Sequence, residues 1–257
     1  MKKIIHLILF IAALLETGDA LAQKEYNIVF IGNSITYGAT HKQPAKTNPT
    51  KSCVKYLMDN GFSAVHGKNA GKSGKTTKDY TPGRQKGYYG LVKKSADELM
   101  TAYPEGKLVF SIMLGTNDAA IRTKKTSWTD DIYKKNMCLI IDSLQERYPD
   151  AIFVIHQDPY FSPNIEKESG TKFDEDCLKQ LQSYWKMDQE IVKEYDKKNP
   201  GKFFLGSDEI YAYFEKNHKE MMTPEEGTKG TYYLHPNPAG SAELGKLWGT
   251  ALAKILK

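Results

Sequence analysis

Short, continuously apolar segments alternate along this chain with longer segments in which apolar residues recur at helical spacing. The clearest apolar segments are 27–31, 107–114, 152–155 and 203–205, and a weaker one at 63–66 suits the edge of a sheet. Strands that are apolar on both faces are typical of parallel sheets covered by helices. We therefore expect an α/β fold in which a parallel sheet lies between two layers of helices.

Three amphipathic segments support this expectation. Apolar residues fall on one helical face from Tyr133 to Tyr148, from Leu178 to Tyr195 and from Leu244 to Ile255. Asn237-Pro238 precedes the last of these, as a helix cap followed by a proline in the first helical position. The alternation predicts one doubly wound domain, and such sheets place their sites at the carboxyl ends of the strands.

The first 22 residues have the features of an export signal. A basic start is followed by an apolar stretch at 4–15 and by Ala20-Leu21-Ala22, a small-x-small cleavage pattern. The apolar stretch is too short to cross a bilayer, and no later segment is apolar enough to do so. We expect residues 1–22 to be a signal peptide and 23–257 to be the domain, exported to the periplasm or secreted.

Charge and cysteine content narrow the classes of partner. The net charge is +5, and its lysines are spread along the chain, which indicates a solvated surface and no nucleic-acid partner. The three cysteines, an odd count that leaves at least one thiol unpaired, are Cys53, Cys138 and Cys177. No spacing of Cys and His suggests a metal site, and we expect no cofactor.

Polar clusters follow the predicted strands. Ser34 comes directly after the first strand, where a serine is more often a helix cap than a nucleophile. The G-x-S-x-G nucleophile elbow is absent, since Thr36 replaces its second glycine. Asn117 follows the strand at 107–114, and its amide could donate to a developing oxyanion, although Asn is also an ordinary turn residue.

Two further clusters complete the set. The glycine-rich segment 69–76 contains Gly74 and could present backbone N–H groups to an anion. His235 lies in Leu234-His235-Pro236-Asn237, just before the last predicted helix. A single histidine is more often structural than catalytic, but proline and the capped helix would fix the position of this one.

In this order the four clusters resemble the SGNH subgroup of GDSL-type hydrolases, whose sequence blocks carry Ser, Gly, Asn and His. The resemblance extends from Tyr26 to the end of the chain. It implies a flavodoxin-like three-layer α/β/α sandwich with a parallel central sheet. It also implies Ser34 as nucleophile and His235 as general base. The implied oxyanion donors are the backbone N–H groups of Ser34 and Gly74 and the side-chain amide of Asn117.

One position departs from the family. An aspartate usually stands three residues before the histidine, and here that residue is Tyr232. A neutral phenol orients an imidazole less well than a carboxylate does. A backbone carbonyl could serve His235 instead and give a Ser–His dyad, or a carboxylate could come from another loop. The first candidate for such a carboxylate is Asp208, followed by Asp158 or Glu226.

The resemblance implies a serine esterase that forms an acyl-enzyme intermediate. An exported member of this family with a polar surface resembles carbohydrate O-acetylesterases, so we expect a small-molecule or glycan ester, with acetyl as the acyl group. A lipid or thioester acyl hydrolase with the same site is the first alternative. A carbohydrate-binding protein with a decayed site, suggested by Tyr232, is the second. The oligomeric state stays open.

Overall fold

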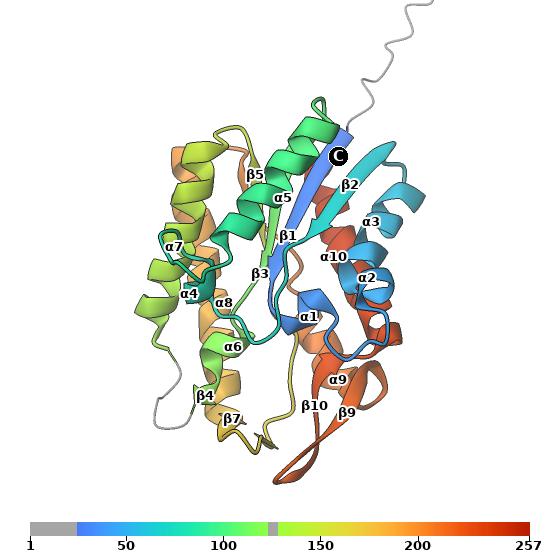
Figure 1. Ribbon diagram of the computed structural model, residues 1–257, viewed down its shortest axis with the longest axis vertical. Coiled ribbons are helices and arrows are strands. Elements are labelled where there is room, and N and C mark those ends of the chain that lie inside the picture. Colours follow the sequence, from blue (N-terminus) through green and yellow to red (C-terminus); the bar gives the residue numbers. More distant parts are fainter. Residues whose placement is uncertain (1–24, 123–127) are drawn as a thin grey trace, which may run out of the picture.

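The computed structural model describes residues 25–122 and 128–257, so the predicted signal peptide at 1–22 lies outside the described residues. Within them, a central sheet of five strands has the order β2-β1-β3-β5-β8 (Figure 1). Its strands are β1 (Glu25–Gly32), β2 (Ala64–Asn69), β3 (Lys107–Met113), β5 (Ile152–Ile155) and β8 (Phe203–Leu205). All neighbouring pairs are parallel, and the weakest of the predicted strands is the edge strand β2.

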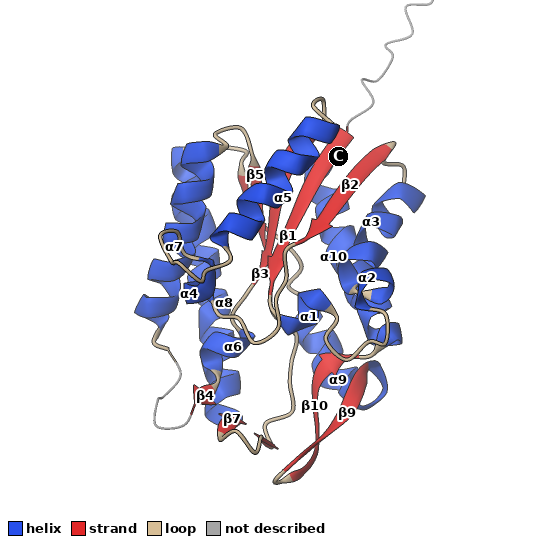
Figure 2. Ribbon diagram, viewed as in Figure 1, coloured by secondary structure: helices blue, strands red, loops and turns tan. Residues whose placement is uncertain are grey.

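Helices cover both faces of this sheet (Figure 2). One face packs against α5 (Tyr89–Ala102), α7 (Asp130–Arg147) and α8 (Glu175–Lys198). The other packs against α3 (Pro49–Asp59), α9 (Ile210–Met221) and α10 (Pro238–Leu256). The predicted three-layer α/β/α sandwich is confirmed, and so are the three helices expected from apolar spacing. Asn237 caps α10 by accepting a hydrogen bond from the backbone N–H of Gly240 at 2.8 Å.

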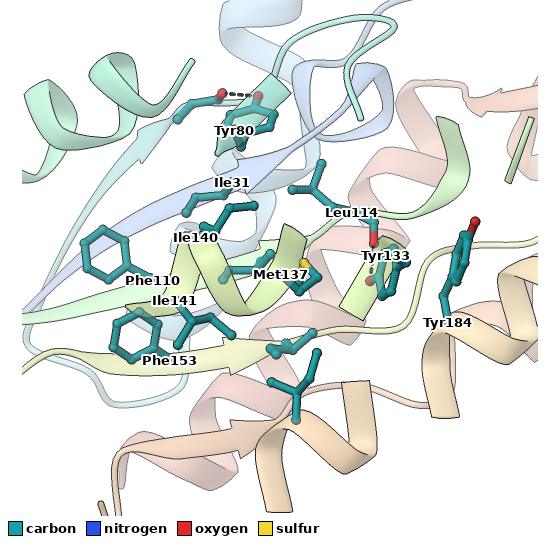
Figure 3. Packing of buried hydrophobic residues seen from close by; sticks show 14 of the residues in the cluster. Ile31, Tyr80, Phe110, Leu114, Tyr133, Met137, Ile140, Ile141, Phe153 and Tyr184 are labelled. Carbon is teal, nitrogen blue, oxygen red and sulfur yellow. Dashed lines mark hydrogen bonds between the residues drawn. The ribbon is translucent and has the colours of Figure 1, made fainter. Parts of the chain in front are cut away.

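Successive residues of a strand point to opposite faces, which explains the continuous apolar segments. In β1, Val29 and Ile31 pack into the core beneath α5, α7 and α8, whereas Ile28 and Phe30 pack beneath α3 and α10. Figure 3 shows the first of these cores. Its buried Tyr133 hydroxyl donates to the Leu114 carbonyl at 2.8 Å, so the polar end of this large ring is satisfied.

Short elements gather at the carboxyl ends of the strands. The helices α1 (Ser34–Tyr37), α4 (Thr77–Tyr80) and α6 (Thr116–Ala119) follow β1, β2 and β3. A hairpin of β9 (Met222–Gly227) and β10 (Gly230–Pro236) lies at the same end of the molecule as α1 and α6 (Figure 1). The remaining elements are α2 (Pro44–Thr47) and a small sheet of β4 (Ile121–Arg122), β7 (Thr171–Phe173) and β6 (Ile165–Glu166).

The three cysteines are free thiols. Cys53 of α3 and Cys177 of α8 are buried, whereas Cys138 of α7 is half-buried. Burial raises the pKa of all three thiols, that of Cys177 to about 11, so they remain protonated at neutral pH. Among the residues the structure describes, no helix combines the length and apolar character that a bilayer crossing requires.

Candidate active site

Ser34 opens helix α1 directly after strand β1. The helix cap is Asn33, whose side-chain oxygen accepts from the backbone N–H of Ile35 at 2.9 Å, so Ser34 is not needed as a cap. The turn requires glycine at position 32, because a Cβ atom there would lie 1.9 Å from the hydroxyl oxygen of Thr36. This local geometry leaves the Ser34 hydroxyl available for contacts with other elements.

The hydroxyl of Ser34 meets the imidazole of His235. Ser34 Oγ lies 2.9 Å from His235 Nε2, although the two residues are 201 positions apart in the sequence. His235 is near the end of β10, just before the Pro236-Asn237 entry into α10. Both residues are 8% exposed, so the pair is largely buried but still in contact with solvent. The structure therefore brings together the two residues predicted as nucleophile and base.

The other ring nitrogen of His235 faces a carboxylate that the sequence did not indicate. His235 Nδ1 lies 2.7 Å from Glu225 Oε1. An ionised carboxylate only accepts hydrogen bonds, so Nδ1 carries the proton and donates it to Glu225. Nε2 of the neutral ring is then free to accept from the Ser34 hydroxyl. This is the tautomer that a general base for Ser34 requires.

The prediction of Asp208 as the orienting acid is therefore wrong, because the carboxylate beside His235 Nδ1 is that of Glu225. The next two candidates, Asp158 and Glu226, are wrong for the same reason. Asp208 follows β8 and lines a different surface hollow, with Leu247 and Lys254 of α10. Asp158 is buried and accepts from the Thr116 hydroxyl at 2.6 Å. Glu226 is exposed and accepts from the Thr231 hydroxyl at 2.8 Å.

The register of the β9–β10 hairpin explains why Glu225 reaches the histidine and Glu226 does not. Neighbouring strand residues point to opposite faces, so Glu225 and Glu226 diverge. Glu225 pairs across the hairpin with Tyr232, and the register shifts between Tyr233 and Pro236. This irregularity turns His235 to the side on which Glu225 and Tyr232 lie. A hairpin could have been suspected from Gly227-Thr228-Lys229-Gly230, but its shift in register leaves no mark on the sequence.

Tyr232, in the position usual for the aspartate, contacts the carboxylate that replaces it. Its hydroxyl donates to Glu225 Oε2 at 3.4 Å, so the two oxygens of Glu225 face two different residues of β10. Burial alone would raise the pKa of Glu225. The hydrogen bond and charge of His235, the charge of Lys167 and the Tyr232 hydroxyl outweigh it, and the pKa is lowered overall. Glu225 is thus ionised at neutral pH and suited to balance an imidazolium.

The predicted oxyanion residues lie in a loop and a helix tied to the Ser34 turn. Gly74 has a φ of 73°, a conformation that favours glycine. On one side of it, the backbone N–H of Lys72 donates to the Gly32 carbonyl at 3.1 Å. On the other side, the Asn117 amide donates to the Lys75 carbonyl at 3.1 Å. The loop that carries Gly74 is therefore bound to both the nucleophile turn and the helix of Asn117.

Two buried carboxylates help to hold the Gly74 loop and helix α6 in position. Asp118 accepts from the backbone N–H and the hydroxyl of Thr77 and thereby binds the Gly74 loop to α6. Asp158 holds Thr116, next to Asn117, and burial raises the pKa of Asp158 to about 6. Within the described ranges, no group of three or more His, Cys, Asp or Glu residues could hold a metal ion.

A family model described as the GDSL-like Lipase/Acylhydrolase family matches residues 30–242, a span that contains Ser34, Gly74, Asn117 and His235. This chain belongs to the GDSL-like lipase/acylhydrolase family. It is therefore an acylhydrolase of the esterase type, and the resemblance to SGNH hydrolases is confirmed at the level of the family.

Several solved structures share the fold of this chain over nearly its whole length. A native M. smegmatis aryl esterase is 16% identical with a TM-score of 0.59, covering 90% of this chain and 98% of that chain. A carbohydrate acetylesterase, Est24 from Sinorhizobium meliloti, is 17% identical with a TM-score of 0.54, covering 90% and 98%. A lipase/acylhydrolase from Enterococcus faecalis is 17% identical with a TM-score of 0.56, covering 89% and 96%.

At these identities the likeness to the three solved structures shows the shared fold and leaves the substrate undetermined. Among curated protein sequences, none matches this chain. The fold and the class of enzyme are thus settled for this family member. The roles of its individual residues have to be argued from their geometry.

Proposed function

We propose that this chain removes acetyl groups from carbohydrate esters, with Ser34 as nucleophile, His235 as general base and Glu225 as the carboxylate that orients the histidine. The observation that carries the proposal is the continuous contact from Ser34 Oγ through His235 to Glu225, at 2.9 Å and 2.7 Å. It gives the serine a base in the required tautomer. The carbohydrate-binding alternative rested on the lack of a carboxylate behind His235, and Glu225 removes that reason.

The proposed reaction has two steps. His235 Nε2 takes the proton of Ser34 as Oγ attacks the acyl carbonyl, and the negative charge moves to the carbonyl oxygen. Backbone N–H groups of Ser34 and Gly74 and the amide of Asn117 stabilise this oxyanion. The C–O bond to the leaving alcohol then breaks, and the imidazolium donates the proton to that alcohol. His235 then takes a proton from a water molecule as the water oxygen attacks the acyl-serine. The bond from the acyl carbon to Ser34 Oγ breaks, the imidazolium donates its proton to Oγ, and the carboxylic acid is released.

Two observations support a short acyl group on a sugar. Half-exposed aromatic rings suit the flat faces of sugar rings. Two are Tyr37, in the same helix as Ser34, and Tyr88, whose ring centroid lies 5.1 Å from Nζ of Lys75 in the loop that carries Gly74. One of the structures with this fold is a carbohydrate acetylesterase. The sequence pattern of residues 1–22 supports the further proposal that the chain is exported, where it would meet glycans.

Hydrolysis of 4-nitrophenyl acetate by purified variants tests the residue roles. Ser34→Ala is expected to lose almost all activity. Asn117→Ala is expected to lose about 100- to 1,000-fold in kcat because one oxyanion donor is removed. Circular dichroism and thermal unfolding check that both variants fold. A Ser34→Ala variant that keeps most of its activity would refute the assignment of the nucleophile.

A series of 4-nitrophenyl esters with acyl chains of increasing length tests the acyl group. We expect kcat/KM to be highest for acetate and to fall as the chain lengthens. A maximum at long chains would favour the lipid hydrolase instead, and acyl-thioester probes run in parallel would reveal a thioesterase. Acetate release from acetylated xylan, with Ser34→Ala as the blank, tests the carbohydrate part of the proposal.

A further inference from the structure

Three half-buried lysines near the proposed site form no ion pair with a carboxylate within the described residues. They are Lys72, Lys75 and Lys167. The first two belong to the loop that carries Gly74, and the third follows strand β6. In the sequence these lysines looked like part of an evenly spread surface charge. Folding brings them to the end of the sheet that carries Ser34 and His235.

Lys72 and Lys75 stand on either side of Gly74. Their backbones are fixed, since the Lys72 N–H donates to Gly32, two residues before Ser34, and the Lys75 carbonyl accepts from Asn117. The side chains of Lys72 and Lys75 therefore extend from backbone positions that are hydrogen-bonded to the nucleophile turn and to Asn117, the proposed oxyanion donor.

Each of these ammonium groups lies near a tyrosine ring. Lys72 Nζ is 5.9 Å from the ring centroid of Tyr37, which belongs to the same short helix as Ser34. Lys75 Nζ is 5.1 Å from the ring centroid of Tyr88. A ring face attracts a cation but leaves its charge unneutralised. Two positive charges and two aromatic faces thus lie together beside the loop of Gly74.

Lys167 adds a positive charge on the histidine side. Its Nζ is 5.6 Å from the ring centroid of Tyr232, whose hydroxyl contacts Glu225. Glu225 is already engaged by His235 at 2.7 Å, and the charge of Lys167 acts on it from a greater distance, as one of the contributions that lower its pKa. Asp79 of α4, which follows the loop that carries Gly74, is likewise engaged, since Thr76 donates to it from both its N–H and its hydroxyl. Neither carboxylate forms an ion pair with the three lysines.

Half-buried lysines elsewhere in the described residues mostly form an ion pair with a carboxylate. Lys134, Lys172 and Lys202 each lie within 3.2 Å of a carboxylate oxygen. Lys93, on α5, has no ion pair but acts on Asp97. Burial raises the pKa of Asp97, and the hydrogen bonds of Tyr148 and Arg147 and the charges of Arg147 and Lys93 outweigh it and lower the pKa overall. An ammonium group that is partly desolvated without a counter-charge is costly, and a bound anion would compensate this cost.

We infer that the ester substrate carries an anionic group near the acyl group, and that Lys72 and Lys75 bind it. This inference rests on the proposed esterase function and narrows its substrate to acetylated acidic glycans. A carboxylate of a uronic acid and a sulfate on a neutral sugar share the required chemistry. The tyrosine rings would hold the sugar, while the ammonium groups would select its charge.

Matched polymers that differ only in charge test the inference. The first pair is acetylated polygalacturonate and the same polymer with its carboxylates methyl-esterified. The second is acetylated dextran sulfate and acetylated dextran. Acetate release is measured for each at about 0.01 M and about 1 M salt, where the screening length falls from about 30 Å to about 3 Å. We expect at least one charged polymer to be preferred by about tenfold in kcat/KM at low salt, and the preference to fall at high salt.

Variants connect this preference to the lysines. Lys72→Met and Lys75→Met keep the length and apolar stem of the side chain and remove its charge. Each is expected to reduce the ratio of charged to neutral kcat/KM several-fold, mainly through KM. The control is Lys202→Met, which removes a half-buried lysine that precedes β8 and so lies at the opposite, amino end of the strands. It should leave the ratio unchanged.

The pair of polymers that shows the preference identifies the anion as carboxylate or sulfate. Equal rates on charged and neutral polymers in both pairs would overturn the inference, as would a preference that survives the loss of both lysines. These results differ from a failure of the proposed function. In that case the wild-type chain would release no acetate from any polymer and would not hydrolyse 4-nitrophenyl acetate.

Discussion

Tyr232 and Glu225 show how one residue can replace another from a neighbouring strand. Tyr232 occupies the position in which the family usually has its aspartate, and the carboxylate comes from the residue paired with it across the hairpin. The oxygens of Glu225 lie 2.7 Å from His235 Nδ1 and 3.4 Å from the Tyr232 hydroxyl. On this basis we expect Glu225 and Tyr232 to act on His235 as positioning residues.

Exchanging the carboxylate between the two strands tests this assignment. Glu225→Gln keeps the shape of the side chain but cannot balance an imidazolium, and we expect kcat to fall by about 100- to 10,000-fold, by analogy with the aspartate of serine protease triads. Adding Tyr232→Asp to this variant places a carboxylate three residues before His235 and should restore part of the lost activity. The acidic limb of the pH–activity profile should also shift in Glu225→Gln. It should move back towards its wild-type position when Tyr232→Asp is added.

The neighbouring residue provides the control for the exchange. Glu226→Gln alters an exposed carboxylate on the opposite face of the same strand and should have wild-type kinetics. Full activity of Glu225→Gln would show that His235 works without a carboxylate, as a Ser–His dyad.

At the level of single residues, the sequence predicted what lies at the ends of the main strands. Two of the predicted site residues, Ser34 and Asn117, follow strands with a clear apolar pattern, and His235 precedes an amphipathic helix. The structure brings the regions that contain these residues together. Glu225 was missed because its position depends on a short polar hairpin, and β9 contains Pro224, which argues against a strand. The roles of Gly74 and Asn117 as oxyanion donors remain predictions for the kinetic experiments.

Among the elements, α3 and α10 pack unusually closely through glycines. A Cβ atom on Gly245 would lie 2.4 Å from the Pro49 carbonyl oxygen and 2.8 Å from the Cys53 backbone nitrogen. Backbone atoms cannot rotate away as a flexible side chain can. The position of α10 also fixes the chain just after His235, so the packing of these two helices supports the site.

Gly245→Ala measures this close approach. Alanine would favour the helix by about 1 kcal/mol, but overpacking costs about 1–3 kcal/mol and here involves backbone on both sides. We expect the free energy of unfolding to fall. Gly90→Ala, on α5, is the control, because nothing lies within 4 Å of its added Cβ atom. The free energy of unfolding of that variant should be unchanged or higher. Chemical denaturation of both variants measures the difference. A stable Gly245→Ala would show that α3 can move without cost.

The longer elements could be predicted because their apolar spacing is imposed by burial on one or two faces. The helices α7, α8 and α10 and all five strands of the main sheet fall where the pattern indicated. The small sheet and the β9–β10 hairpin were not predicted. Their strands are short and partly polar, so they lack the alternation or continuous apolar character by which a strand is recognised.

Across the whole molecule, a second serine–histidine pair lies in the core and shows why distance alone does not define a site. Ser111 Oγ is 2.9 Å from His156 Nε2, the same separation as in the Ser34–His235 pair. The backbone N–H of Ser207 donates to His156 Nδ1, so the proton of this neutral ring is on Nε2 and is donated to Ser111. Burial lowers the pKa of His156 to about 3. This ring cannot accept a proton from Ser111 and instead links the sheet to Trp248 of α10 through Ser111.

Buried carboxylates should make the stability of the whole domain depend on pH. Burial raises the pKa of Asp158 to about 6 and that of Asp188 well above its ordinary value. Between about pH 4 and the raised pKa, the unfolded chain has lost a proton that the folded chain keeps, so stability falls as pH rises.

Asp188→Asn tests this sign at a residue outside the proposed site. Asp188 accepts from the Tyr133 hydroxyl at 3.1 Å, and asparagine is a neutral side chain of the same shape whose amide oxygen can accept this hydrogen bond. The variant should gain stability relative to the wild type at pH 8 but much less at pH 4, as measured by urea unfolding at both values. An equal difference at the two pH values would show that Asp188 keeps its charge in the folded state.

The most direct test of the central claim is the site of covalent labelling by a fluorophosphonate. The probe reacts with a serine only when a base activates it, and intact mass followed by peptide mapping identifies the modified residue. We predict one label per chain, on Ser34, with labelling lost in Ser34→Ala and strongly slowed in His235→Ala. No label on Ser34 in a folded preparation that hydrolyses 4-nitrophenyl acetate would contradict the account.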